Sequence, residues 1–291
     1  MRRKRPGRYG QQTGTIATSP KEIDSIIRQE YGAIYKGNNP SQGSPDALAE
    51  QYLHDYRDYI FNQPEMLMED LTGEDVELAV DALKATAGGM DQWGPADLKL
   101  LSTLACKQLA TFFNLIEGGA PWPEQLRYAR AAFLAKEEDS DLDPMDYRVL
   151  LMLPAIYRLW GKIRLEHLSP WISTWDLQEV YAGIEGKGAA VAAYATAIEI
   201  GYCRLAGTPY TGGAADIYNC FDQIRRDVVY KLLDRAGMPK RVTHAYMNFL
   251  EALVVRNTVA GGLGEAYTRP TSIPQGEPTV SYTHLTLPTK A

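Results

Sequence analysis

The stretch GGAADIYNCFDQIRRDV, residues 212 to 228, places two aspartates six positions apart around a short apolar run. The run Ala214 to Ile217 follows two glycines and predicts a buried strand that carries Asp216 near its end. A buried carboxylate is unfavourable without a partner, so Asp216 is either a satisfied residue that caps the next helix or a metal ligand. We interpret Asp222 as a helix-start residue, because a negative charge is stabilised beside the N-terminal helix dipole.

The elements around this stretch predict an α+β fold. Helical patterns and short strands are mixed without the regular βαβ alternation of a doubly wound sheet, which favours an antiparallel-leaning sheet with helices packed on one side. The expected strands lie at 129–136, 147–154, 210–218, 253–260 and 263–273. The expected helices lie at 20–35, 46–61, from 72 onward, 94–116, 155–168, 187–205, 225–236 and 239–252.

Composition excludes several classes of protein. With 291 residues, 45% hydrophobic and 23% charged, the chain resembles an ordinary globular protein, and no apolar run is long enough to span a membrane. Three scattered cysteines form no zinc-ligand or disulfide pattern, which favours a reducing compartment and hence an intracellular protein, nuclear or cytoplasmic. The net charge of −6 leaves nucleic-acid binding to local surfaces and to the basic arm, whose first charges are Arg2, Arg3, Lys4 and Arg5. A solvated tail is the alternative interpretation of that arm.

Two further places have residue types suited to binding a nucleotide. Lys136 and Arg148 flank the acidic turn EEDSDLDP (137–144), where two cations could hold a triphosphate or simply be surface charges. The turn PQGEP (274–278) combines a rigid proline, a flexible glycine and an amide side chain, although tight turns commonly have such residues. GIEGKGAA (183–190) lacks the spacing of a P-loop.

Taken in order, five segments resemble the fingers and palm of a reverse transcriptase of the non-LTR retrotransposon and group II intron type. No single segment is decisive, and the resemblance rests on their order. Three of them are AFLAKEEDSDLDPMDYRVLLMLPAIYRLWGKIRLEHL (132–168), ADIYNCFDQI (215–224), which resembles the catalytic strand D-x-x-x-A-F-D-x-V, and IPQGEP (273–278), which resembles G-V-P-Q-G-S-P. GGMDQWGPADLKLLS (88–102) and LQEVYAGIEGKGAAVAAYA (177–195) resemble two further blocks of that family. The resemblance covers about 190 residues and implies a partial polymerase fold.

The resemblance implies a role for each matching residue. Asp216, helped by the carbonyl of Ile217, would bind the catalytic Mg²⁺, of which the full-length parent uses two ions. Phe221 would lie under the sugar of the incoming nucleotide. The other implied nucleotide-binding residues are Lys136, Arg148, Gln275 and Gly276, and the implied nucleic-acid contacts are the basic arm and Lys187. The implied partners are an RNA template, a DNA primer and deoxynucleoside triphosphates.

The sequence also departs from the family. Val149 replaces the usual proline after Tyr147-Arg148, and the block around Gly186-Lys187-Gly188 differs from the family's pattern. No hairpin with paired aspartates follows residue 228, and VSYTHLTLPTKA (280–291) resembles a translated sequencing adapter, so we expect a non-native tail there.

We therefore predict four regions and an inactive fragment. They are a basic disordered arm (1–20), a helical extension (21–85), a fingers and palm fragment (86–279) and the adapter-derived tail (280–291). One aspartate cannot hold two metal ions, so we expect no polymerase activity from this chain. The alternatives are a non-catalytic RNA-binding or maturase-like splicing factor with the same fold, and a helical interaction protein whose DxxxxFD segment is coincidental.

Overall fold

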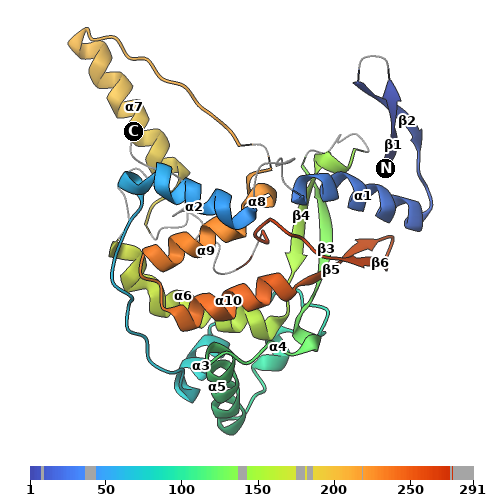
Figure 1. Cartoon of the computed structure of the whole chain (residues 1–291), viewed down its shortest axis with the longest axis vertical. Coiled ribbons are helices and arrows are strands. Elements are labelled where there is room, and N and C mark those ends of the chain that lie inside the picture. Colours follow the sequence, from blue (N-terminus) through green and yellow to red (C-terminus); the bar gives the residue numbers. More distant parts are fainter. Residues whose placement is uncertain are drawn as a thin grey trace.

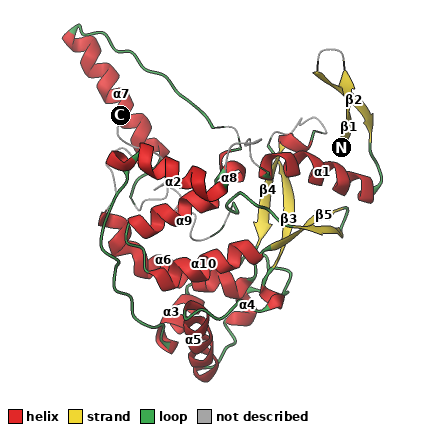
Figure 2. Cartoon of the chain, in the orientation of Figure 1, coloured by secondary structure: helices red, strands yellow, loops and turns green. Residues whose placement is uncertain are grey.

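The computed structural model describes residues 1–7, 10–36, 44–136, 143–174, 181, 186–217, 219–275 and 277. Figure 2 shows helices arranged around one small sheet, with a separate two-stranded ribbon at the N-terminus. The α-helices are α1 (Pro20–Tyr35), α2 (Pro45–Asp55), α3 (Gly73–Asp81), α4 (Pro95–Leu98), α5 (Thr103–Glu117), α6 (Ala155–Thr174), α7 (Ala189–Ala206), α8 (Cys220–Gln223), α9 (Arg226–Arg235) and α10 (Lys240–Ala252). Single 3₁₀ turns lie at Arg57–Tyr59, Glu124–Leu126 and Pro144–Asp146. None of these helices combines the length and the apolar character that crossing a membrane requires.

The main sheet has four strands in the order β4-β3-β5-β6. The strands are β3 (Tyr128–Ala135), β4 (Tyr147–Met152), β5 (Val254–Val259) and β6 (Gly262–Tyr267). β3 pairs antiparallel with β4 and parallel with β5, and β5 pairs antiparallel with β6. Two of the three pairings are antiparallel, so the α+β class and the antiparallel-leaning sheet are confirmed.

The two faces of this sheet differ in burial. Ala129, Ala131, Val149, Leu151 and Val255 point to the core and are buried, whereas their neighbours along each strand are partly or fully exposed. This alternation follows from the two-residue period of a strand. The sheet therefore has one covered face and one accessible face.

Helix α1 packs against the covered face and joins the N-terminal region to the rest of the molecule. Tyr31 on α1 lies 6.2 Å from Phe133 of β3, measured between ring centroids, and its hydroxyl donates to the carbonyl of Tyr147 at 2.9 Å. Asp24 on α1 accepts a hydrogen bond from Asn257 of β5 at 2.9 Å. α1 and α3 belong to the same hydrophobic core as the later helices, so the boundary expected near residue 86 does not separate two cores.

The N-terminal arm differs from the expectation that residues 1–20 lack structure. β1 (Arg2–Gly7) and β2 (Gly10–Ile16) form an antiparallel ribbon in which Lys4 pairs with Thr13. The β-branched residues of the second strand favour extended backbone, and the two strands satisfy each other's backbone groups. Figure 1 shows this ribbon standing beside α1 and away from the main sheet.

Three expected helices have different bounds in the structure. The helix predicted over residues 46–61 ends at Asp55 and is followed by the 3₁₀ turn Arg57–Tyr59. The helix predicted over residues 94–116 is divided into α4 and α5, because the Ser102 side chain accepts from the Ala105 amide at 3.3 Å and caps a new helix. α6 continues beyond the expected Leu168 to Thr174 despite the internal Pro170. α7 projects from the body of the molecule, and none of its residues is buried (Figure 1).

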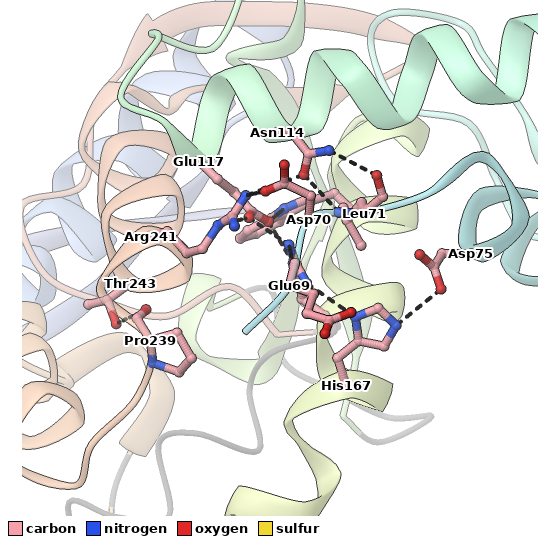
Figure 3. Close-up of polar contacts among 12 residues, drawn as sticks. Glu69, Asp70, Leu71, Asp75, Asn114, Glu117, His167, Pro239, Arg241 and Thr243 are labelled. Carbon is pink, nitrogen blue, oxygen red and sulfur yellow. Dashed lines mark hydrogen bonds and ion pairs between the residues drawn. The ribbon is translucent and has the colours of Figure 1, made fainter. Parts of the chain in front are cut away.

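A buried charge cluster joins α5, α6 and α10 (Figure 3). The Glu117 carboxylate accepts from Arg164 Nε at 2.6 Å and from Trp160 Nε1 at 2.9 Å, and it forms an ion pair with Arg241 Nε at 2.7 Å. Arg164 Nη1 is 3.1 Å from His167 Nδ1, and His167 Nε2 is 3.4 Å from Asp75.

Candidate nucleotide site

Three segments that are far apart in the sequence meet around α8. The amide of Ile273 donates to the carbonyl of Phe221 at 3.0 Å, and the amide of Ser272 donates to the carbonyl of Ile224 at 2.9 Å. Asn219 Nδ2 lies 3.7 Å from Met145 Sδ, in the turn that leads into β4. The segment after β6, the α8 turn and the base of β4 therefore form one junction, which we call the α8 junction.

The two predicted triphosphate-binding cations lie at the open end of the β3–β4 pair. Lys136 directly follows β3, is exposed, and donates from Nζ to the carbonyl of Met145 at 2.8 Å. Arg148 is exposed on β4, opposite Leu134 of β3. Both side chains are on the accessible side of the hairpin, where they could contact an anion.

Asp222 is the buried carboxylate of the junction. Its side chain is 7% exposed, and one oxygen lies 3.5 Å from Nη2 of Arg269. Burial raises the pKa of Asp222 above the usual aspartate range, and the positive charges of Arg269 and Lys136 oppose that increase. The hairpin is linked to α8 by Met145, whose carbonyl accepts from Lys136 and whose sulfur lies 3.7 Å from Asn219 Nδ2.

Asp216 is not where the sequence predicted it. The expected buried strand is absent: residues 208–217 have no regular secondary structure, Asp216 is exposed, and Ile217 is 55% exposed. A strand requires hydrogen bonds to a neighbour, and within the described residues the main sheet contains β3 to β6 and no strand from this segment. Asp216 precedes α8 by four residues, and burial, together with the Asp216 carboxylate, raises the pKa of the Cys220 thiol.

The sequence correctly predicted that Asp222 lies at the start of a helix, but it did not predict the ion pair that Asp222 forms. It lies in the first turn of α8, as expected for a helix-start residue. The sequence did not show that it is buried against Arg269, 47 residues away. The sequence shows one arginine between Tyr267 and Pro270, but nothing near it indicates that its partner is Asp222.

The PQGEP turn lies partly within the described residues. Gln275 is half-buried and follows the buried residues Ser272, Ile273 and Pro274, which pack at the α8 junction. Gly276 lies outside the described residues, as do the acidic residues 137–142 and the tail 280–291. Phe221, half-buried in α8, and Gln275 are therefore brought near each other by the Phe221–Ile273 hydrogen bond.

The predicted nucleic-acid contacts are only partly described. The structure describes the backbone of Arg2, Arg3, Lys4 and Arg5 in β1 but not their side chains, so contacts of this arm stay a prediction. Lys187 precedes α7 and is half-buried.

The described residues do not fit a two-metal centre. No group of three His, Cys, Asp or Glu side chains within them is arranged to hold a metal ion. Asp222 pairs with Arg269, and Asp216 is exposed. Asp216 is then the one aspartate of residues 215–224 without that pairing, whereas two-metal chemistry requires more than one carboxylate ligand. We derive no catalytic step through Mg²⁺ from these residues.

The accessible face of the sheet has two arginines that sequence reasoning missed. Arg130 of β3 and Arg256 of β5 are directly paired in the parallel register, and Arg148 points to the same face from β4. Arg130 Nη2 donates to the Gly88 carbonyl at 3.3 Å and Arg256 Nη1 to the Gly264 carbonyl at 3.0 Å, so neither hydrogen bond neutralises the charge. Adjacent like charges are unfavourable, and a polyanion would relieve the repulsion. The register between strands 126 residues apart created this pair, so no local pattern could have revealed it.

A cavity of about 420 Å³ is lined by α2, α9 and α10. Another, of about 380 Å³, lies between the start of α1 and the β5–β6 hairpin, and Arg256 is one of its lining residues. No family model matches this sequence, and a search of curated proteins finds no match either.

Proposed function

We propose that this chain is the nucleotide- and template-binding part of an RNA-directed DNA polymerase. The observation that carries the proposal is the α8 junction. Three segments that resemble reverse-transcriptase motifs are separated widely in sequence, yet they lie together in space. The Phe221–Ile273 hydrogen bond and the contacts of Lys136 and Asn219 with Met145 support this grouping.

The substrate would be a deoxynucleoside triphosphate. Lys136 and Arg148 supply positive charge for the phosphates, and arginine can contact two phosphate oxygens at once. Phe221 and Gln275 are half-buried, and so each has surface free to contact the sugar and base. The residues of this chain would therefore bind and orient a nucleotide.

The template would be a single strand on the accessible sheet face. Arg130, Arg148 and Arg256 all point to that face, and the exposed Leu134 lies directly opposite Arg148. Phosphate contacts by arginine provide most of the sequence-independent affinity for nucleic acid. A strand bound on this face would reach the Lys136 and Arg148 end of the hairpin, where the incoming nucleotide would lie.

Titration with a fluorescent deoxynucleoside triphosphate tests this proposal. We expect Arg148→Gln to weaken binding by about tenfold, because a hydrogen bond to a charged group contributes about 1.5–3 kcal/mol. Arg204→Gln, an exposed arginine on α7, is the matched control and leaves binding unchanged. Absence of nucleotide binding by the unmodified chain would overturn the proposal.

A primer-extension assay tests the expectation that this chain has no polymerase activity. With one aspartate outside a metal centre, we expect no template-dependent synthesis in Mg²⁺ or Mn²⁺. Template-dependent DNA synthesis by this chain would contradict that expectation.

The exposed position of Asp216 favours a second candidate, a non-catalytic RNA-binding protein such as a maturase-like splicing factor. That function needs the arginine face and not the nucleotide site. RNA binding together with no detectable nucleotide binding would select this candidate over the polymerase.

A further inference from the structure

Arg269 is a charged residue enclosed in the protein interior near the α8 junction. Its side chain is 5% exposed, and its guanidinium lies 4.1 Å from the centroid of the Tyr35 ring on α1. Nη1 is within 3.2 Å of Ser272 Oγ, and Nη2 donates to the Tyr35 hydroxyl. Arg269 therefore contacts α1 and the segment that precedes Gln275 at the same time.

Asp222 is the acidic partner of Arg269 among the described residues. The 3.5 Å contact joins two side chains that are both almost fully buried. A buried charge without its partner is strongly unfavourable, so each of these residues keeps the other in place. Since Asp222 belongs to α8, the pair connects α8 to α1 through Arg269.

Further hydrogen bonds connect Arg269 and Asp222 to Phe221 and Gln275, the residues proposed to contact the nucleotide. Thr271 Oγ1 lies 2.9 Å from the Tyr35 carbonyl and 3.2 Å from the Asp222 carbonyl. The next two amides, of Ser272 and Ile273, donate to the carbonyls of Ile224 and Phe221. The segment from Arg269 to Ile273 therefore forms hydrogen bonds with residues of α8 and with Ile224 at its C-terminal end. Gln275 follows this segment by two residues.

We propose that Arg269 and Asp222 are positioning residues that hold Phe221 and Gln275 in one arrangement and make that arrangement depend on α1. The proposal rests on the proposed function for its ligand, a deoxynucleoside triphosphate. Neither residue needs to touch the nucleotide, because both act through the backbone bonds around α8. α1 is then a structural part of the site and not a dispensable extension.

Hydrogen–deuterium exchange on the full chain tests the positioning role without a ligand. We expect Asp222→Asn and Arg269→Gln each to speed exchange of the Ser272 and Ile273 amides by about tenfold or more, while amides within α10 change less. The double variant removes both charges and restores part of the protection, because no unpaired charge stays buried.

Arg164→Gln is the matched control, since Arg164 is an equally buried arginine that belongs to the separate Glu117 cluster. We expect it to leave exchange at Ser272 and Ile273 unchanged, whereas amides of α10, whose Arg241 contacts Glu117, can exchange faster. Equal loosening by this control, no loosening by the two single variants, or a double variant worse than both would overturn the positioning role.

Binding of dATP in Mg²⁺, measured below the unfolding temperature of every variant, provides the second readout. We expect both single variants to weaken binding by about tenfold and Arg164→Gln to leave it unchanged. If the unmodified chain binds no dATP, the proposed function fails, and the exchange experiment still decides the positioning role. If the unmodified chain binds and the two variants bind equally well, the positioning role fails alone.

Discussion

Glu117 and Arg164 form a two-pronged ion pair in which Nε and Nη2 of the arginine each lie 2.6 Å from a different carboxylate oxygen. Both side chains are 0% exposed. The pair connects the end of α5 to α6, and Arg241 adds a second positive charge from α10. Three helices below the sheet are therefore held by one carboxylate.

Replacing Glu117 by glutamine should destabilise the fold by about 3–5 kcal/mol, because two arginines would keep their charge without a buried partner. Chemical denaturation monitored by tryptophan fluorescence measures this loss. Asp70→Asn is the control: Asp70 also contacts Arg241, at 2.6 Å, but its side chain is 73% exposed. We expect it to cost less than about 1 kcal/mol. Equal losses would show that burial does not decide the strength of these contacts.

Asp75 should make stability depend on pH in the acid range. Partial burial opposes its ionisation, but hydrogen bonds from the Thr72 amide and hydroxyl, together with nearby His167, outweigh burial and lower its pKa. A carboxyl with a lowered pKa in the folded state adds stability above its unfolded pKa of about 3.9, and that stability is lost as the pH falls through the folded value.

We therefore expect Asp75→Asn to reduce stability near neutral pH and to flatten its decline below about pH 4. Urea unfolding at a series of pH values measures both effects, and carbon NMR of the Asp75 carboxyl locates its titration. Thr72→Ala removes one of the donors and should move that titration toward the usual range. An unchanged titration in this variant would contradict the assignment to Thr72.

Local patterns in the sequence predicted the elements with strong end signals. α3 begins after Thr72, where a helix was expected, and Thr72 and Asp75 form a capping box there. The hairpin turn at Gly261 also lies where the sequence placed it, although its second strand ends at Tyr267 and not at residue 273. These features depend on residues within a few positions of each other. The division between α4 and α5 was missed because Ser102 could have continued the helix or capped a new one.

Pairing over long distances could not be predicted in the same way. The run Ala214 to Ile217 has strand-like composition, but whether it becomes a strand depends on a neighbour elsewhere in the chain. The burial of Asp222 depends on Arg269, and the arginine face depends on the register of β3 against β5. In both cases the decisive partner is remote in sequence.

Gly237 should tolerate no side chain. Its φ is 79°, and an added Cβ would overlap the backbone carbonyl of Pro64. Gly237→Ala therefore combines left-handed backbone strain with a clash, and we expect it to cost more than the about 1–2 kcal/mol that the strain alone contributes.

Gly261 provides the matched control for this prediction. It also has φ 79°, but a Cβ there would meet open space. Thermal or urea unfolding of both alanine variants separates the strain from the clash, because they share only the strain. Similar losses in the two variants would mean that the chain near Pro64 moves aside freely.

The arginine face of the sheet should bind single-stranded RNA through phosphates. Each phosphate contact releases counterions, so the logarithm of the binding constant falls with the logarithm of salt concentration by about 0.7 per contact. Arg130→Gln and Arg256→Gln should each reduce this slope by about 0.7 and weaken binding to unrelated sequences alike. Fluorescence anisotropy with labelled RNA at several salt concentrations measures both quantities. Arg57→Gln, whose side chain is 67% exposed beside Asp58 and outside the sheet, should leave the slope unchanged. A slope that falls equally in this control would mean that RNA responds to overall charge, and the paired arginines would then have no special role.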